Sequence, residues 1–166
     1  MRVLGIDPGT AITGFGVVDE EAGSLNARAY GVIRTPADQS LPYRLQMIYQ
    51  GVRGLVDEWK PTTASVEELF FSSNVRTAMA VGQARGVALL ALVDAGLSVF
   101  EYAPMVVKQA VTGYGSADKA QIQDMVRLLL GLAAVPRPDD AADALAVAIC
   151  HLHSARLAAL AAGCAG

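Results

Sequence analysis

The chain has 166 residues, of which 53% are hydrophobic and 17% charged, and its formal net charge is −3. This length fits a single domain over residues 1–166, large enough to bury a core. The high apolar share excludes a disordered chain, and two cysteines are too few for a disulfide scaffold. On net charge alone, an acidic chain is a poor candidate for binding nucleic acid.

The sequence carries no sign of a membrane or secretory segment. No uninterrupted apolar stretch approaches the roughly 18 residues of a spanning helix. Asp7 comes before any apolar signal segment can form, and Cys150 and Cys164 lack the spacing of a disulfide framework. We therefore expect a reduced, cytoplasmic protein with no membrane partner and a frayed end over residues 158–166.

The first half of the chain begins with three predicted strands, over residues 2–7, 14–19 and 24–34, separated by short turns. Short turns favour an antiparallel meander. A helical stripe follows over residues 45–59, with Ser40 as a candidate N-cap and Pro61 as a stop. The pattern then predicts, in order, a strand, a helix stopped at Gly96 and another strand: 62–67, 74–95 and 97–102.

The rest of the chain is predicted to be helical. Pro104 suits the first turn of a short helix, and Ser116 is the candidate cap of the next. The last helix begins after Pro138 and runs past His153. Three antiparallel strands followed by two strands entered through helices predict an α/β domain with a mixed five-stranded sheet flanked by helices. This is the layout of the ribonuclease H-like fold.

Acidic residues stand where α/β sheets bind ligands. Asp7 and Glu67 each end a predicted strand, while Asp140 and Asp143 share one face at the start of the last helix. Four carboxylates converging from these positions repel one another unless Mg²⁺ or Mn²⁺ lies between them. Two such ions about 4 Å apart would clamp the attacking and leaving oxygens of a phosphodiester. The set therefore predicts metal-dependent hydrolysis of a nucleic-acid backbone.

Each acid also has an ordinary explanation. Asp7 can open a turn, and acids favour helix N-termini, where Asp139 is the better N-cap candidate. Strand alternation turns Glu68 away from the face of Glu67. Two competing motifs are weaker: the glycines of residues 14–16 lack the third glycine of a dinucleotide site, and a zinc site lacks matched spacing in its four candidates, Cys150, His151, His153 and Cys164.

Several motifs follow one another over residues 2–153: GIDPGT at 5–10, TGFG at 13–16, VEELF at 66–70, GQARG at 82–86, VKQ at 107–109, GYGSADK at 113–119 and DAADAL at 140–145. Together they resemble the RuvC family of bacterial Holliday-junction resolvases. The resemblance implies a dimeric endonuclease that makes paired, symmetrical nicks in four-way DNA, leaving 5′-phosphate and 3′-hydroxyl ends. It implies four catalytic and metal-binding carboxylates: Asp7, Glu67, Asp140 and Asp143.

By this mechanism, a metal-activated water would attack the phosphorus in line with the departing 3′-oxygen, with Asp7 bridging both ions. The resemblance also implies DNA contacts from Lys108 and Lys119, and insertion of Phe70, beside Phe71, near the junction centre. Base stacking on such a ring contributes about 1–3 kcal/mol. Arg76 is a further candidate contact.

Two local patterns add to these expectations. Ser116, with the glycines before it, precedes a helix and offers an anion site. Ala78, Gly82 and Gly86 recur every four residues, which permits close packing either on the chain's own sheet or on a second copy, and the resemblance favours a dimer interface. The family further suggests a branch-migration helicase partner of the RuvA–RuvB type. It often has a basic tail, but no Lys or Arg follows Arg156 here.

The placement of charges changes what the net charge means. No acid occurs over residues 69–93 or 102–117, and two bound ions would offset the net charge. We therefore expect DNA binding that depends on divalent metal and weakens steeply with salt. Three alternatives remain: an actin-like ATPase, whose phosphate loop also reads Asp-x-Gly-Thr; a junction-binding protein that does not cut; and a related ribonuclease H-like nuclease with another substrate.

Overall fold

The structure is a computed structural model that describes residues 1–68 and 75–163 of the chain. Its strands are β1 (Arg2–Asp7), β2 (Ile12–Glu21), β3 (Ser24–Arg34), β4 (Thr63–Glu67) and β5 (Ser98–Tyr102). Its helices are α1 (Leu41–Trp59), α2 (Val75–Asp94), α3 (Pro104–Thr112), α4 (Lys119–Leu129) and α5 (Asp139–Gly163). The predicted order of elements is confirmed, with bounds that differ by a residue or two at most ends.

The strands form one five-stranded sheet in the order β3-β2-β1-β4-β5. β1, β2 and β3 pair antiparallel, whereas β4 runs parallel to both β1 and β5. This is the predicted mixed sheet. Because β1 and β4 are parallel neighbours, with Ile6 opposite Val66, their carboxyl ends lie side by side at the same end of the sheet.

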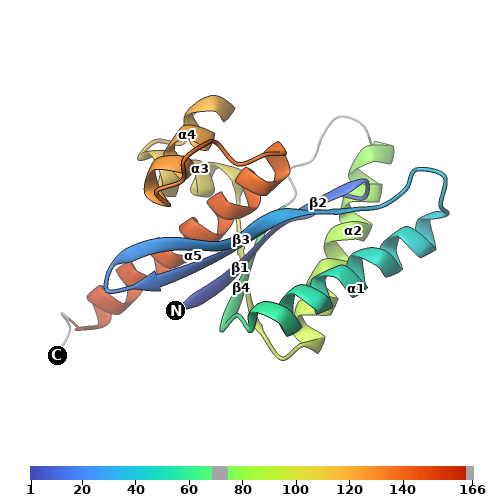
Figure 1. Ribbon diagram of the computed structural model, residues 1–166, viewed down its shortest axis with the longest axis horizontal. Helices are drawn as coiled ribbons and strands as arrows, with labels where there is room; N and C mark the ends of the chain where they lie inside the picture. The colour runs from blue at the N-terminus through green and yellow to red at the C-terminus, as the bar shows by residue number, and fades with distance from the viewer. Residues whose placement is uncertain (69–74, 164–166) are drawn as a thin grey trace.

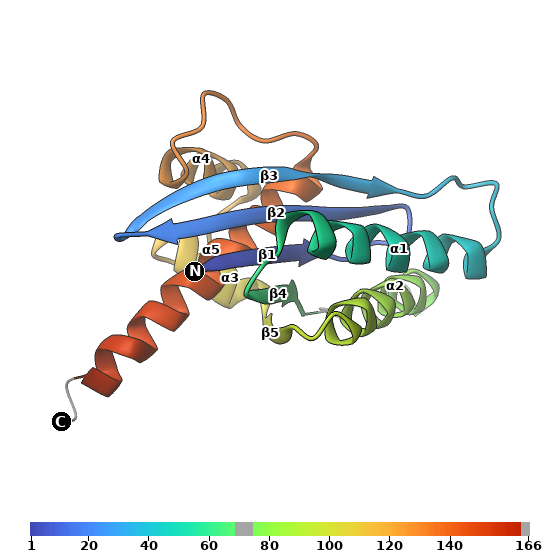
Figure 2. The ribbon, with the colours of Figure 1, turned by 60° about the horizontal axis from the view of Figure 1, so that its bottom comes forward.

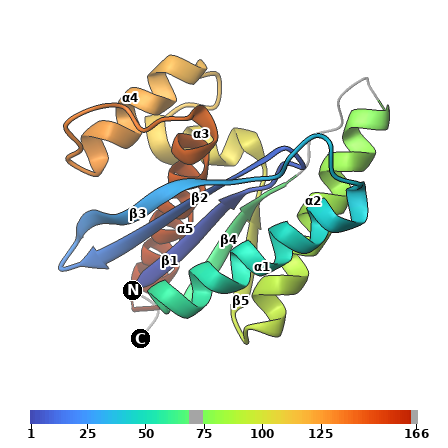
Figure 3. The ribbon, with the colours of Figure 1, turned by 45° about the vertical axis from the view of Figure 1, so that its right-hand side comes forward.

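Helices cover both faces of the sheet (Figure 2). α1 and α2 pack together on one face, while α5 crosses the other and carries α3 and α4 on its outer side (Figures 1 and 3). Neighbouring strand residues point to opposite faces. Leu4 and Ile6 therefore join the core under α1 and α2, and Val3 joins the core under α5, which includes Leu145 and Ile149.

Two helices have the length and mean hydropathy of a membrane span, over Thr77–Asp94 in α2 and Asp139–Ala161 in α5. Residues 144–152 of α5 are buried between the sheet and the outer helices, so the protein core accounts for their apolar character. α5 continues as a helix to Gly163, and fraying of residues 158–166 stays a prediction.

Two helix starts differ from the sequence expectation. α4 is capped by Asp118, not Ser116: the Asp118 carboxylate accepts from the Gln121 backbone N–H, and the Gln121 side chain accepts from the Asp118 N–H. This reciprocal pair is a capping box, which outcompetes a lone serine. α5 begins at Asp139 itself, so Asp139 is not the cap, and its carboxylate accepts a 2.6 Å hydrogen bond from Arg137.

Three glycines bring α5 unusually close to the sheet. A methyl group on Gly5 would lie 2.1 Å from the carbonyl oxygen of Ala144, and one on Gly14 would lie 2.0 Å from that of Asp140. A methyl on Gly16 would lie 2.7 Å from the side chain of Leu145. Only glycine permits this approach at Gly5 and Gly14, because the opposing atoms are backbone. The first turns of α5 are therefore pressed against β1 and β2.

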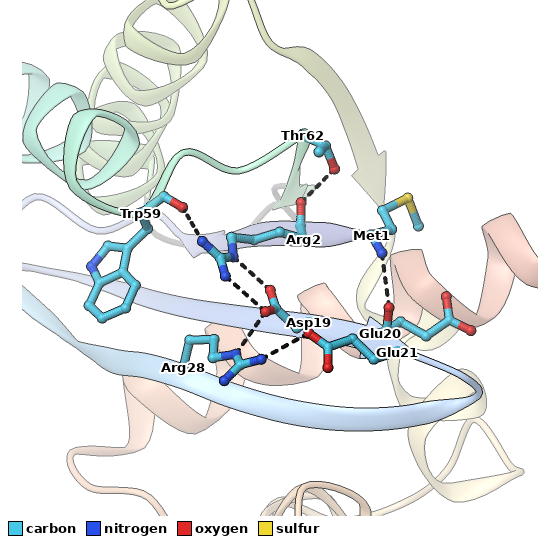
Figure 4. Close-up of polar contacts among 8 residues, drawn as sticks. All are labelled: Met1, Arg2, Asp19, Glu20, Glu21, Arg28, Trp59 and Thr62. Atoms are coloured by element: carbon cyan, nitrogen blue, oxygen red, sulfur yellow. Dashed lines mark hydrogen bonds and ion pairs between the residues drawn. The ribbon is translucent and has the colours of Figure 1, made fainter.

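A charged network ties together the end of the sheet farthest from the carboxyl end of β1 (Figure 4). The Asp19 carboxylate, only 6% exposed, accepts two hydrogen bonds from Arg2, of 2.7 and 2.9 Å, and one of 2.7 Å from Arg28. Arg2 also donates to the backbone oxygen of Trp59 at 2.7 Å. The network joins β1, β2, β3 and the end of α1.

The Asp19 network predicts a pH dependence of stability. Hydrogen bonds from Arg2, and then Arg28, outweigh burial and lower the pKa of Asp19 to about 2. Because the folded pKa lies below the unfolded value, the contribution is complete above the unfolded pKa and disappears as pH falls toward 2. It amounts to about 2 kcal/mol. Urea unfolding between pH 5 and pH 2 should show this loss in the native chain and less of it in Asp19→Asn, whereas exposed Asp57→Asn should keep the native profile.

Candidate active site

Four acidic side chains lie near enough to influence one another's charge at the carboxyl ends of β1 and β4. Asp7 ends β1 and Glu67 ends the adjacent parallel strand β4. Asp140 and Asp143 come from the first turns of α5, which the glycines hold against the sheet. Gly14 is the strand partner of Asp7 and also the point where the carbonyl of Asp140 approaches β2, so it brings the strand acid and the helix acid together.

The negative charges of these acids repel one another. Burial, and then the charges of Glu67, Asp143 and Asp140, raise the pKa of Asp7 to about 8. Burial, and then the charge of Asp143, raise the pKa of Glu67 to about 7 and outweigh the opposing charges of Lys108 and Lys119. Burial also raises the pKa of Asp143. The edge thus holds more negative charge than its neighbouring cations neutralise.

Lysines stand on the α3–α4 side of these acids. Lys119 Nζ lies 3.2 Å from Asp143 Oδ2 and 3.4 Å from Asp139 Oδ2. Although burial lowers the pKa of Lys119, the charges of Asp143 and Asp139 outweigh it, and the pKa is raised. Lys108 and Lys119 line a hollow of about 210 Å³ together with Glu67 and Asp143. A phosphate in this hollow would meet both ammonium groups next to two of the acids.

The donors of this site suit a hard divalent ion. Carboxylate oxygens are the preferred ligands of Mg²⁺ and Mn²⁺, and a cation among them would relieve the repulsion that raises their pKa values. Within residues 1–68 and 75–163, no three acidic, His or Cys side chains are arranged as a ready-made metal cluster. The zinc alternative finds no support, because both ring nitrogens of His151 already bond to hydroxyls, of Thr63 at 2.9 Å and Tyr102 at 2.8 Å.

Comparison with known proteins gives a consistent result. The sequence model described as "Crossover junction endodeoxyribonuclease RuvC" matches residues 3–151. The chain belongs to this family. A protein of that name from Chloroflexus aggregans is 61% identical over 155 residues, which cover 93% of this chain and 94% of the relative. The Thermus thermophilus RuvC structure matches with a TM-score of 0.87 and 38% identity, covering 95% of this chain and 97% of that one.

A second structure bears on the substrate. Thermus thermophilus RuvC in complex with a Holliday junction matches with a TM-score of 0.87 and 37% identity, covering 95% of this chain and 96% of that one. Membership of the RuvC family makes the chain a crossover junction endodeoxyribonuclease, a hydrolase of DNA recombination and repair. The resemblance seen in the sequence motifs and the ribonuclease H-like sheet are both confirmed.

Some candidate residues of this RuvC chain stay predictions. Phe70 and Phe71 lie outside the described residues, and Arg76 lies in the first turn of α2, where its side chain is not described. Ser116 is exposed between α3 and α4. Its proposed anion site is weaker than expected, because the carboxylate of Asp118 already occupies the N-terminus of α4.

Sequence reasoning missed one arginine beside the site. Arg85 of α2 forms an ion pair with Glu101 of β5 and donates a 3.4 Å hydrogen bond to the backbone oxygen of Glu67. It therefore links α2 to the end of the strand that carries an acid. The GQARG motif contains Arg85, but its partner lies on a strand that is distant in sequence, and no local pattern announces the contact.

α2 exposes an apolar stripe that the described part of the chain does not cover. Met79, Leu90 and Val93 are 63%, 54% and 60% exposed, respectively. Gly86 lies in the same stripe, and a methyl group there would meet nothing within 4 Å. Ala78 and Gly82, predicted with Gly86 to form the seam, are half-buried beside it. The open face of α2 is thus centred on the larger apolar residues as much as on the small ones.

Proposed function

We propose that this chain resolves four-way DNA junctions by paired, symmetrical nicks, with two Mg²⁺ or Mn²⁺ ions held by Asp7, Glu67, Asp140 and Asp143. The supporting observation is a group of half-buried acids at the carboxyl ends of β1 and β4, two of them with pKa values raised to about 7 and 8, beside two lysines. Such a site gains most from binding a divalent cation together with a phosphate.

The residues divide into two tasks. The carboxylates hold the ions, with Asp7 and Glu67 fixed by the sheet and Asp140 and Asp143 by α5. When bound, the ions would supply Lewis-acid chemistry: they would polarise the scissile phosphate and lower the pKa of the attacking water, with the 3′-oxygen as the leaving group and a 5′-phosphate in the product. Lys108 and Lys119 attract the phosphate backbone to the acids. The ion pair between Lys119 and Asp143 must loosen before Lys119 can contact a phosphate.

The decisive experiment compares substrates. Purified chain is incubated with Mg²⁺ or Mn²⁺ and, in turn, a labelled four-way junction, a linear duplex of the same sequence and an RNA–DNA hybrid. We expect symmetrical, ligatable nicks in the junction alone, lost in EDTA and weakened by salt. Cleavage of the hybrid or the duplex instead would favour a related nuclease with another substrate. Junction binding without cleavage would favour a junction-binding protein, and turnover of ATP would favour an actin-like ATPase.

A homodimer is the proposed active form. Two symmetrical nicks need two sites, and an isologous two-fold dimer supplies them. The exposed apolar stripe of α2 is suited to such an interface, because a patch of this kind rarely stays uncovered on a monomer. Gly86 leaves space in the stripe for a neighbouring side chain.

Introducing a charge into the stripe tests the dimer. Leu90→Asp should reduce the association constant by about a hundredfold, since a buried unpaired carboxylate costs several kcal/mol at an interface. Sedimentation velocity should show the variant as a monomer at concentrations where the native chain is a dimer. Leu128→Asp is the matched control, since Leu128 is 59% exposed on α4. Equal dissociation of both variants would place the interface elsewhere.

Two further parts of the proposal rest on the family resemblance. We place the protein in the cytoplasm, where chromosomal junctions arise, which suits the buried free thiol of Cys150. A branch-migration helicase of the RuvA–RuvB type is the proposed protein partner. Co-purification of the chain with that helicase on a four-way junction would test the partnership.

A further inference from the structure

A second hollow, which neither Lys108 nor Lys119 lines, borders the acids at Asp140. It measures about 520 Å³ and is lined by the β1–β2 turn, Arg44 of α1 and Ala80 and Val81 of α2, with Asp140 at its border. The lysine-lined hollow borders Glu67 and Asp143 instead. The two hollows thus border different acids, Asp140 in one case and Glu67 with Asp143 in the other.

Hydrogen bonds fix Arg44 at the wall of this second hollow. Its Nε donates to Thr35 Oγ1 at 2.8 Å, and Thr35 Oγ1 donates to the backbone oxygen of Thr10 at 2.5 Å. Thr10 Oγ1 in turn donates to the backbone oxygen of Ala80 at 2.7 Å. This series joins α1, the end of β3, the turn after Asp7 and α2, so it holds the guanidinium in a set position relative to the acids.

Arg44 shares this hollow with one acid, Asp140, but forms no close ion pair within the described part of the chain. Among the residues that the structure describes, no acid forms an ion pair with Arg44, and its terminal nitrogens have no hydrogen-bond partner. Of the described residues that line the hollow, Arg44 is also the one with a positive charge. Arg44 is half-buried. A guanidinium held through Nε, with terminal nitrogens that no described residue bonds, is suited to a bidentate contact with a phosphate.

We propose that this hollow binds the DNA strand next to the scissile phosphate, with Arg44 contacting a flanking phosphate. A strand that passes over the acids must continue on both sides of them. On one side it meets Lys108 and Lys119, and on the other side the apolar walls of the hollow can pack a sugar while Arg44 meets the backbone. This inference rests on the proposed junction cleavage and adds the second half of the strand's path.

The hollow is distinct from the proposed dimer seam. Its α2 residues, Thr77, Ala80 and Val81, do not belong to the exposed stripe of Met79, Leu90 and Val93. A second copy seated on that stripe would leave the hollow available. The border with Asp140 and the positive charge of Arg44 both favour DNA as the occupant.

Salt dependence of junction binding tests the contact. Arg44→Gln is measured in an Asp7→Asn background, which keeps the junction uncut, by anisotropy titration at a series of salt concentrations. We expect affinity to fall about tenfold and the slope of log K against log salt to decrease by about 0.9 for each chain bound. Arg53→Gln removes the same charge about two and a half turns further along α1 and should leave affinity and slope nearly unchanged.

Two controls separate contact from packing. Thr35→Val removes the hydroxyl that positions Arg44 but keeps its charge, so affinity should fall while the salt slope stays native. In a second control, one phosphate beside the scissile phosphate is replaced by a neutral methylphosphonate, at a different position in each junction. At the position that Arg44 contacts, the replacement should weaken binding by the chain with native Arg44 and should not weaken binding by Arg44→Gln any further. Two results would overturn the proposal. One is a slope of log K against log salt that is the same in Arg44→Gln as in the native chain. The other is that the affinity losses from Arg44→Gln and from the methylphosphonate add at every position tested. A parent protein that does not bind junctions would instead overturn the proposed function.

Discussion

Replacing Asp7 by asparagine is expected to reduce junction cleavage by about a thousandfold or more, because the ions would lose a carboxylate that faces the other three. Junction binding should survive, since Lys108 and Lys119 are untouched. Single-turnover nicking with Mg²⁺ and Mn²⁺, next to anisotropy binding of the same junction, measures the two effects separately. Native-like cleavage by the purified variant would show that the proposed metal site is wrong.

The same substitution should stabilise the metal-free fold. The pKa of Asp7 is raised to about 8 in the folded chain, above its value in the unfolded chain, so folding is penalised once pH rises above the unfolded pKa. Asparagine removes this penalty, and the Tm of Asp7→Asn in EDTA at pH 8 should exceed that of the native chain. Glu68→Gln is the matched control: Glu68 is exposed just beyond β4, and both cleavage and Tm should stay native.

A loss of cleavage together with a gain in stability is expected where a residue serves function at the expense of the fold. Buried carboxylates that repel one another cost stability, and they are retained where their charge is used. The contrast with Asp19 is direct. That acid, at the other end of the sheet, is buried too, but it is bonded to two arginines, and its pKa falls to about 2. One acid is stabilised by the fold, and the other is held at a cost.

The strands, the helices and the positions of the four acids on them could be predicted from the sequence because they depend on local patterns. Strand alternation and turn residues indicated that Asp7 and Glu67 end strands, and helical spacing placed Asp140 and Asp143 on one face. The parallel pairing of β1 with β4 then follows from the helix between them. What the motifs added was which acids of each neighbouring pair belong to the site.

Contacts between distant segments were beyond the sequence. Asp118 and Gln121 do form a recognisable capping box, so the choice of Ser116 overlooked a local signal. The Arg85 contact to Glu67 and the hydrogen bond from Arg44 to Thr35 are different, because each depends on how two packed elements meet. No spacing rule connects their partners.

Gly14 is the clearest case of a residue whose purpose appears only in three dimensions. In the sequence it belongs to an incomplete glycine motif. In the structure it pairs with Asp7 and lies under the first turn of α5, where an added methyl group would be 2.0 Å from the Asp140 carbonyl oxygen. The opposing atom is backbone, so no side-chain rotation can relieve the overlap, and α5 itself must move.

Gly14→Ala is therefore expected to reduce cleavage by about a hundredfold, the effect of displacing a catalytic group by about 1 Å. The free energy of unfolding should fall by about 1–3 kcal/mol from overpacking. Junction affinity should stay within a few-fold of native, because the lysines and Arg44 are attached to other elements. Single-turnover nicking, urea unfolding and anisotropy titration of one preparation measure the three quantities.

Gly31→Ala supplies the comparison, since it adds the same methyl group to the adjacent strand β3. There the nearest atoms belong to the ring of Phe15, at 3.1 Å, and a side chain can shift by a few tenths of an ångström. Gly31→Ala should lose some stability and keep its cleavage rate. If Gly14→Ala folds and cuts as fast as Gly31→Ala, the close approach of α5 is a packing feature and Asp140 is positioned by other contacts. A selective loss in Gly14→Ala would mean that the glycine sets the distance between the strand acids and the helix acids.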